Sequence, residues 1–100
     1  MTDQHDAKMQ AWNVAQDEGP YPGTRWRHYK GGLYVVEGPC VIEATAEAAV
    51  AYRSLRYGTV LIRSVANFFE YVTLQPGGEC VARFRPEPWT TEAPQDEGAS

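Results

Sequence analysis

Basic and aromatic side chains around a Gly-Gly turn are the residues of this chain best suited to chemistry. Residues 27–34 read Arg-His-Tyr-Lys-Gly-Gly-Leu-Tyr. A guanidinium group grips phosphate or carboxylate through paired hydrogen bonds, and an aromatic ring stacks on a base. The pattern predicts a surface that binds an anionic nucleotide-like ligand or nucleic acid. The predicted ligand-binding residues are Arg27, His28, Lys30, Tyr34, Tyr52, Arg53 and Arg63.

This set of residues leaves alternatives open. Alternation in a strand over residues 26–29 puts Arg27 and Tyr29 on one side. His28 and Lys30 then lie on the other side, and either pair could face outward. A single histidine is more often hydrogen-bonded within a fold than a ligand. The arginines could instead form surface ion pairs and merely complete the domain surface. The candidate partners are Glu37, Glu43 and Glu70.

The central part of the chain is poor in the residues that catalysis needs. Residues 23–85 contain no aspartate, one histidine and one lysine. Cys40 or Cys80 could pair with His28, but no third group orients such a pair. The sequence shows neither a phosphate-binding glycine motif nor a cluster of metal ligands. We therefore expect a protein that is not an enzyme, with no catalytic residue, no metal and no cofactor.

Charge divides the chain into a basic centre and acidic ends. The whole chain has nine lysines and arginines against 13 acidic residues, a net charge of −4. Residues 23–85 hold eight of the basic residues and five glutamates, a net charge of +3. A basic surface favours anionic partners. The alternative is that the acidic ends only keep a small protein soluble.

The sequence also bounds the compartment and the partners. It contains no apolar run as long as a membrane span and no secretion signal, so a cytoplasmic protein without a membrane partner is expected. In a reducing compartment, Cys40 and Cys80 are expected to be buried thiols rather than a disulfide or a zinc pair. Either a monomer or a homodimer is compatible with the pattern.

Turn residues and β-branched runs predict a mainly β domain over residues 23–85. Five or six short strands and one helical turn in so few residues favour a small barrel that closes on itself. Turns are expected at Gly31-Gly32, Tyr57-Gly58 and residues 76–78. The strand segments are expected within Trp26–Tyr29, Leu33–Val36, Cys40–Ala44, Ala48–Leu55, Thr59–Ile62, Tyr71–Leu74 and Cys80–Phe84.

Breaks and ends complete the predicted organisation. Gly38-Pro39 is expected to interrupt the strands, and Ser64 can cap the helical turn. Residues 1–22 are expected to form a flexible tail with a possible short helix over Asp6–Gln16. Residues 86–100 are expected to form a disordered acidic tail, because they are rich in proline, glutamate and small residues.

Several motifs of the central part recur in the order and spacing of a known family. They are Arg27–Gly31, Tyr34, Val50–Leu55, Leu61–Arg63 with Phe68–Glu70, and Ala82–Phe84. Over residues 26–84 the chain resembles the domain-of-unknown-function family numbered 1653, which occurs in bacteria and their phages. The resemblance implies an SH3-like small barrel and no established activity. It therefore gives an architecture and candidate positions.

The chain departs from the pattern of that family in one loop. Residues 39–49 are apolar and small, where the family is usually basic and rich in Ser and Thr. Ser64 and Ala82 stand where proline is usual. If that loop touches a ligand in relatives, this chain would bind a different one.

A protein-interaction module is the alternative function. Small barrels present sheet edges and aromatic grooves to partner peptides. Tyr71, Trp89 and the proline-containing residues 86–88 favour this alternative. The occurrence of the family in phages would fit an inhibitor of a host protein.

Overall fold

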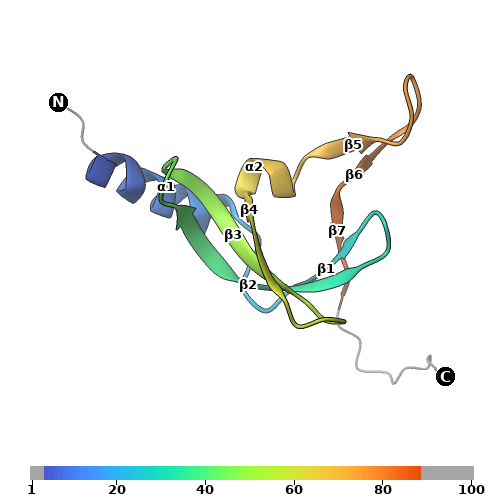
Figure 1. Ribbon diagram of the computed structural model, residues 1–100, viewed down its shortest axis with the longest axis horizontal. Helices are drawn as coiled ribbons and strands as arrows, with labels where there is room; N and C mark the ends of the chain where they lie inside the picture. Colours follow the sequence, from blue (N-terminus) through green and yellow to red (C-terminus); the bar gives the residue numbers. More distant parts are fainter. Residues whose placement is uncertain (1–3, 89–100) are drawn as a thin grey trace.

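The computed structural model describes residues 4–88, which form an antiparallel β structure with two helices (Figure 1). The prediction of a mainly β domain with one helical turn after Ser64 is confirmed. The elements are α1 Gln4–Glu18, β1 Arg25–His28, β2 Leu33–Ile42, β3 Glu47–Ser54, β4 Val60–Ser64, α2 Val65–Phe68, β5 Tyr71–Thr73, β6 Cys80–Ala82 and β7 Phe84–Pro86.

The strands form an open sheet and a separate hairpin. The main sheet has the strand order β4-β3-β2-β1-β7, and β5 pairs only with β6. The prediction of a closed barrel is wrong, because β4 and β7 are the two opposite edges of the main sheet. The chain between these edges forms α2 and the β5–β6 hairpin, so no strand joins them. Figure 1 shows this segment rising away from the curved β2–β3 hairpin.

The longest strand, β2, continues through the point where the sequence predicted a break. Its register with β3 shifts between Val36 and Gly38, which marks a β-bulge or irregularity. β1 pairs with residues 33–35 of β2, so beyond the shift β2 has no strand neighbour on that side. Proline has no N–H to donate and is tolerated at bulges and along sheet edges. The strand therefore passes through Pro39 and ends at Ile42.

The hydrophobic core lies on one face of the main sheet, which we call the inner face. Side chains of β2, β3 and β7 meet there under α2, and Trp26 and Tyr34 pack against them. Phe68 of α2 is fully buried and stacks on Phe84, with ring centroids 4.2 Å apart. The core cluster consists of Val36, Val50, Tyr52, Phe68 and Phe84.

The start of α2 is set by a capping side chain. Ser64 is extended, and its Oγ accepts a hydrogen bond from the Asn67 N–H at 3.1 Å. This contact satisfies one of the N–H groups that a helix leaves without a partner at its first turn. The cap fixes where the chain turns from β4 into α2, and so places Phe68 over the sheet.

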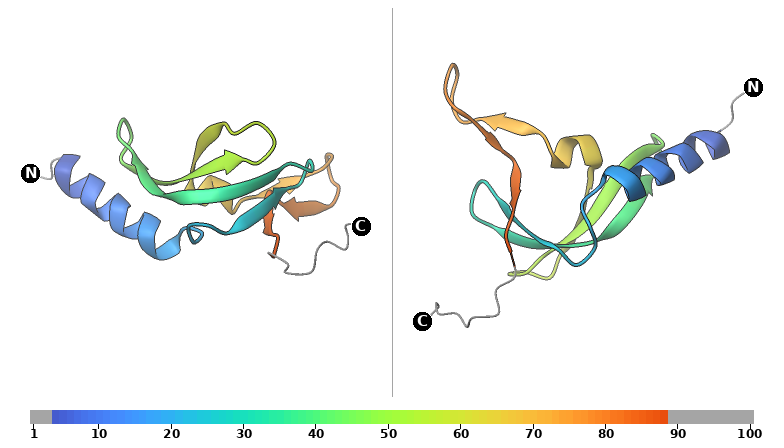
Figure 2. Two further views of the ribbon diagram at one scale, coloured as in Figure 1. Left: turned by 90° about the horizontal axis from the view of Figure 1, so that it is seen from below. Right: turned by 180° about the vertical axis from the view of Figure 1, so that it is seen from behind.

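The helix α1 packs against β2 and β3 (Figure 2). Ala11 and Ala15 are 7% and 2% exposed, and Lys8 Nζ lies 3.3 Å from a carboxylate oxygen of Glu43 in the β2–β3 turn. This helix is longer than the segment that the sequence indicated.

No helix within residues 4–88 is long and apolar enough to cross a membrane. Trp89 and most of the expected acidic tail lie outside the described residues.

The two cysteines are free thiols that differ in exposure. Cys40 on β2 is half-buried, and burial raises the pKa of its thiol. Cys80 on β6 is exposed, and its Sγ lies 3.4 Å from Thr73 Oγ1 across the hairpin. The expectation of two buried thiols is therefore wrong for Cys80.

Candidate functional site

The predicted ligand-binding residues lie on both faces of the main sheet rather than on one surface. Directly opposed residues of an antiparallel pair point to the same face. Arg63 pairs with the core residue Val50, which places Arg63 on the inner face. The residues of the set on the inner face are His28, Tyr34, Tyr52 and Arg63. Those on the opposite, outer face are Arg27 and Arg53, and Lys30 lies in the β1–β2 turn.

The inner-face residues of the set serve the core. Tyr52 is 2% exposed, and its ring lies 5.4 Å from those of both Tyr34 and Phe84. Arg63 Nε donates to the Tyr52 hydroxyl at 3.0 Å, and its guanidinium also donates to the Asn67 side-chain oxygen. Tyr52 therefore has no open ring face for a stacked base, and two nitrogens of Arg63 are already bonded.

His28 lies at the margin of the core. Its Nδ1 accepts a hydrogen bond from the Lys30 N–H at 3.1 Å, and its ring lies 5.0 Å from Phe84. Burial lowers the pKa of His28, and the positive charges of Arg63, Arg83 and Lys30 lower it further. A lowered pKa disfavours the positively charged form of this histidine. Its contacts are those of a structural histidine.

Arg53 on the outer face forms an ion pair with Glu37 of β2. This is one of the surface pairings that the sequence left open. The Glu37 carboxylate compensates the charge of Arg53 within the sheet.

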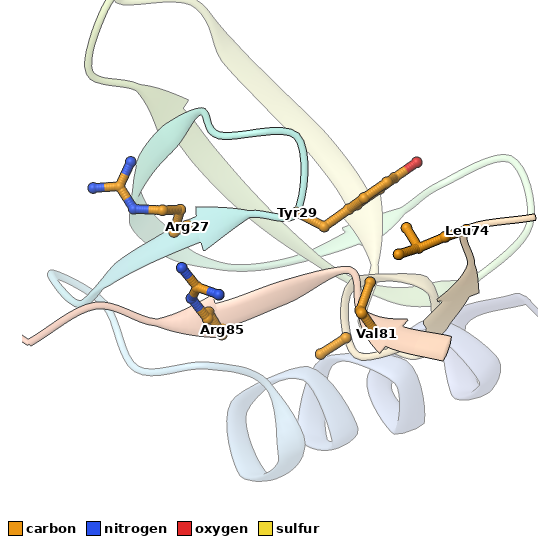
Figure 3. Close-up of a pocket in the computed structure, with 6 residues that line it drawn as sticks. Arg27, Tyr29, Leu74, Val81 and Arg85 are labelled. Carbon is orange, nitrogen blue, oxygen red and sulfur yellow. The ribbon is translucent and has the colours of Figure 1, made fainter. Parts of the chain in front are cut away.

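The outer face carries a pocket between β1, the β5–β6 hairpin and β7 (Figure 3). Its volume is about 190 Å³. Arg27 of β1 and Arg85 of β7 are directly opposed in the antiparallel register, so both project to the same face. Tyr29 follows β1 at one side of the pocket. The lining residues are Arg27, Tyr29, Leu74, Val81, Ala82 and Arg85.

One carboxylate, that of Glu87, lies near three arginines at this place. Glu87 accepts two hydrogen bonds from Arg27, at 3.1 and 3.3 Å. The hydrogen bonding of Arg27 lowers the pKa of Glu87, and the charges of Arg27, Arg25 and Arg85 lower it further. The Arg85 side chain is exposed and has no hydrogen bond or ion pair with any residue of the described part of the chain. The pocket therefore holds uncompensated positive charge.

The geometry brings together residues that the sequence did not select as a set. Arg27 was in the predicted set, whereas Tyr29, Arg85 and the apolar wall were not. Alternation had already put Tyr29 on the side of Arg27. Arg85 is far away in the sequence, and no local pattern shows that β7 pairs with β1.

Comparison with known proteins supports the family but no activity. The family model described as "Protein of unknown function (DUF1653)" matches residues 24–86. A crystal structure of a protein belonging to DUF1653 from Bordetella bronchiseptica is similar in fold, with a TM-score of 0.53 and 30% sequence identity. The match covers 64% of this chain and 83% of that chain. No curated protein matches the sequence.

Proposed function

This chain belongs to the DUF1653 family, and we propose that it is a non-enzymatic binding module for a phosphate-bearing, nucleotide-like ligand. The carrying observation is the directly opposed pair Arg27 and Arg85. Like charges directly opposite each other in a sheet destabilise it. A ligand anion between the two guanidinium groups would offset this repulsion. Because the repulsion raises the free energy of the unliganded protein, it favours the bound state.

The pocket residues divide the work of binding such a ligand. Arg85 would supply the free N–H groups that bind the phosphate. Arg27 already donates to Glu87 and, at 2.9 Å, to the Gly31 carbonyl oxygen. The Tyr29 ring is half-buried and lies 4.6 Å from the His28 ring, so a base would stack on the part of the Tyr29 ring that stays exposed. Pockets that enclose a whole small-molecule ligand have about 300–1,000 Å³. At about 190 Å³ this pocket has room for the phosphate and one neighbouring group, and the rest of the ligand would lie on the surface.

The residues that line the pocket lack the groups that acid–base catalysis needs. The lining includes neither a histidine nor a carboxylate to act as a general base. Glu87 nearby has a lowered pKa, which makes it a poor proton acceptor, and His28 projects to the inner face. A small SH3-like binding domain in the cytoplasm stays our proposal for the protein as a whole.

A thermal-shift series tests this function. The full chain, Arg85→Gln and the control Lys8→Gln are melted at low salt with phosphate, AMP, ADP and cyclic AMP. Lys8→Gln is a matched control, because this substitution also removes one positive charge but does so on α1, away from the pocket. A ligand at ten times its Kd stabilises the native state by about 1.4 kcal/mol, which raises the Tm of a domain of this size by about 5–10 °C.

The expected result is a rise in Tm for wild type and Lys8→Gln that fades with salt and is lost in Arg85→Gln. Arg85 has no described partner, so its replacement is expected to leave the fold intact. The proposal is refuted if no nucleotide raises the Tm, or if Arg85→Gln keeps the full rise.

The second candidate function is binding of a protein strand along β4. Val60, Leu61 and Ile62 of this edge strand are 54%, 39% and 59% exposed. Native edges are usually protected by charge or proline, and the other edge, β7, carries Arg85 and Pro86. Replacing Ile62 by lysine should abolish capture of a strand-adding partner. Equal capture by wild type and Ile62→Lys would exclude this edge.

A further inference from the structure

Three basic side chains of the described part of the chain have neither a hydrogen bond nor an ion pair, and two of them lie around one turn. The other six lysines and arginines all have partners, such as Lys8 with Glu43, Arg53 with Glu37 and Arg83 with Glu70. A charged side chain without a hydrogen bond or an ion pair can bind an external anion without first leaving an internal carboxylate or carbonyl group. The three residues are Lys30, Arg56 and Arg85.

Two of these three residues line a second pocket, where the β1–β2 turn meets the end of β3. Its volume is about 560 Å³. The Leu55 N–H donates to the Leu33 carbonyl oxygen at 3.1 Å, which ties the two turns together. No carboxylate lines this pocket. The lining residues are Lys30, Gly31, Gly32, Leu33, Leu55 and Arg56.

The second pocket adjoins the first through the β1–β2 turn. Arg27 and Tyr29 line the first pocket, and Lys30 and Gly31 line the second. Arg27 Nη1 donates to the Gly31 carbonyl oxygen at 2.9 Å, and Lys30 Nζ lies 5.8 Å from the centre of the Tyr29 ring. A chain of positive charge therefore runs from Arg85 past Arg27 and Lys30 to Arg56.

Each pocket has a tyrosine beside its cations. Tyr29 lines the first pocket, where it is half-buried and its ring lies 4.6 Å from that of His28, and Tyr57 follows the pocket residue Arg56 in the sequence. Tyr57 is 74% exposed, and the Arg56 guanidinium lies 5.3 Å from the centre of its ring. Proteins that bind single strands with little sequence preference combine cations along the strand's backbone with aromatic rings on which bases stack. A mononucleotide would use only one of the two pockets.

We propose that the two pockets form one track for single-stranded nucleic acid, with phosphates at Arg85, Lys30 and Arg56 and bases on Tyr29 and Tyr57. This inference rests on the proposed function, because it uses the same first pocket. It adds the class of ligand, a strand with several phosphates. A duplex is not expected to bind as well, because its stacked bases cannot reach the tyrosine rings.

The experiment compares ligand lengths on the full chain. Fluorescence anisotropy at low salt measures affinity for labelled dT8 and rU8, with dTMP and a dT2 dinucleotide as competitors and a hairpin duplex as a further probe. The variants are Lys30→Gln, Arg56→Gln, Tyr57→Ala and Arg85→Gln. Lys8→Gln is the control that removes one charge elsewhere.

The track predicts that dT8 or rU8 binds at least about tenfold more tightly than dTMP. For a single strand, each phosphate contact contributes about 0.7 to the slope of log affinity against log salt. Arg56→Gln and Lys30→Gln should each reduce that slope by about 0.7, and Lys8→Gln should not. Loss of one stacked base in Tyr57→Ala should weaken dT8 about fivefold or more.

Other outcomes separate this inference from the function on which it rests. If dTMP and dT8 bind equally well, Arg85→Gln loses both, and the variants at Lys30 and Arg56 change nothing, the track is wrong and the first pocket stands. If the hairpin duplex binds as well as dT8, the assignment to single strands is wrong. If neither dTMP nor any oligonucleotide binds, both proposals fail.

Discussion

Replacing Glu87 by glutamine should lower stability and raise anion affinity at the same time. Glu87 accepts two hydrogen bonds from Arg27 across the β1–β7 pair, and the two side chains are 31% and 32% exposed. Ion pairs at this level of exposure contribute up to about 1 kcal/mol. The free energy of unfolding of Glu87→Gln should therefore fall by about that amount or less.

The gain in affinity follows from the same geometry. An anion between Arg27 and Arg85 would lie close to the Glu87 carboxylate, because that carboxylate is in contact with Arg27. Two unit charges 4 Å apart repel each other by about 1 kcal/mol in water. Removing the negative charge of Glu87 should therefore strengthen anion binding by about fivefold, and it also releases the Arg27 guanidinium for the ligand.

The assay combines urea unfolding with titration of ADP or dT8 at low salt. Glu37→Gln is the matched control, because it breaks the ion pair with Arg53 on the same face of the sheet but outside the pocket. The control should lose a similar amount of stability and leave the affinity unchanged. A fall in affinity in Glu87→Gln, or an equal gain in Glu37→Gln, would refute the reasoning about local charge.

Hydrogen bonding from Arg27 lowers the pKa of Glu87, so the stabilisation by the Glu87 carboxylate is fully present above its usual pKa of about 4.5 and is lost as pH falls through the lowered pKa. The difference in unfolding free energy between wild type and Glu87→Gln, measured by urea unfolding, should therefore shrink as the pH is lowered below 4.5; a difference that stays constant would contradict this linkage. Phe68→Ala should cost about 3–5 kcal/mol, and Phe69→Ala, at a side chain 41% exposed, should cost clearly less; equal losses on chemical unfolding would contradict the assigned core. Ser64→Ala removes the cap of α2 and should cost about 1 kcal/mol, whereas Ser64→Asp should restore most of it.

Local chemistry predicted the elements of this fold better than their assembly. The turn after β1 needs Gly31, whose φ is +108°, and Ser64 caps the start of α2. These are contacts within a few residues, which a sequence pattern records directly. Closure of a barrel depends on whether β4 meets β7, and the chain between them offers no local sign of that choice. The break expected at Pro39 failed for a related reason, since a proline is tolerated where the neighbouring strand has already ended.

The candidate site shows the same division between local and long-range information. Alternation correctly put Arg27 and His28 on opposite faces of β1, but it could not say which side was buried. Tyr29 follows β1 and lines the pocket with Arg27, while its ring also contacts that of His28. Aromatic residues of the core occupy the inner side. Tyr52 is therefore part of the core, and Tyr34 packs against it instead of forming a binding surface. The residue that completes the pocket is Arg85, which reaches Arg27 only through the long-range pairing of β7 with β1.

The two faces of β1 make binding and stability separable by mutation. Trp26 packs against the core on the inner face, so its replacement would unfold the domain before it reported on any ligand. Arg27 is on the outer face but holds both Glu87 and the turn carbonyl of Gly31, so its loss would disturb the pocket and the turn together. Arg85 has neither role among the described contacts. A loss of affinity in Arg85→Gln at unchanged unfolding free energy would therefore be attributable to the ligand contact alone, which no other arginine of the pocket allows.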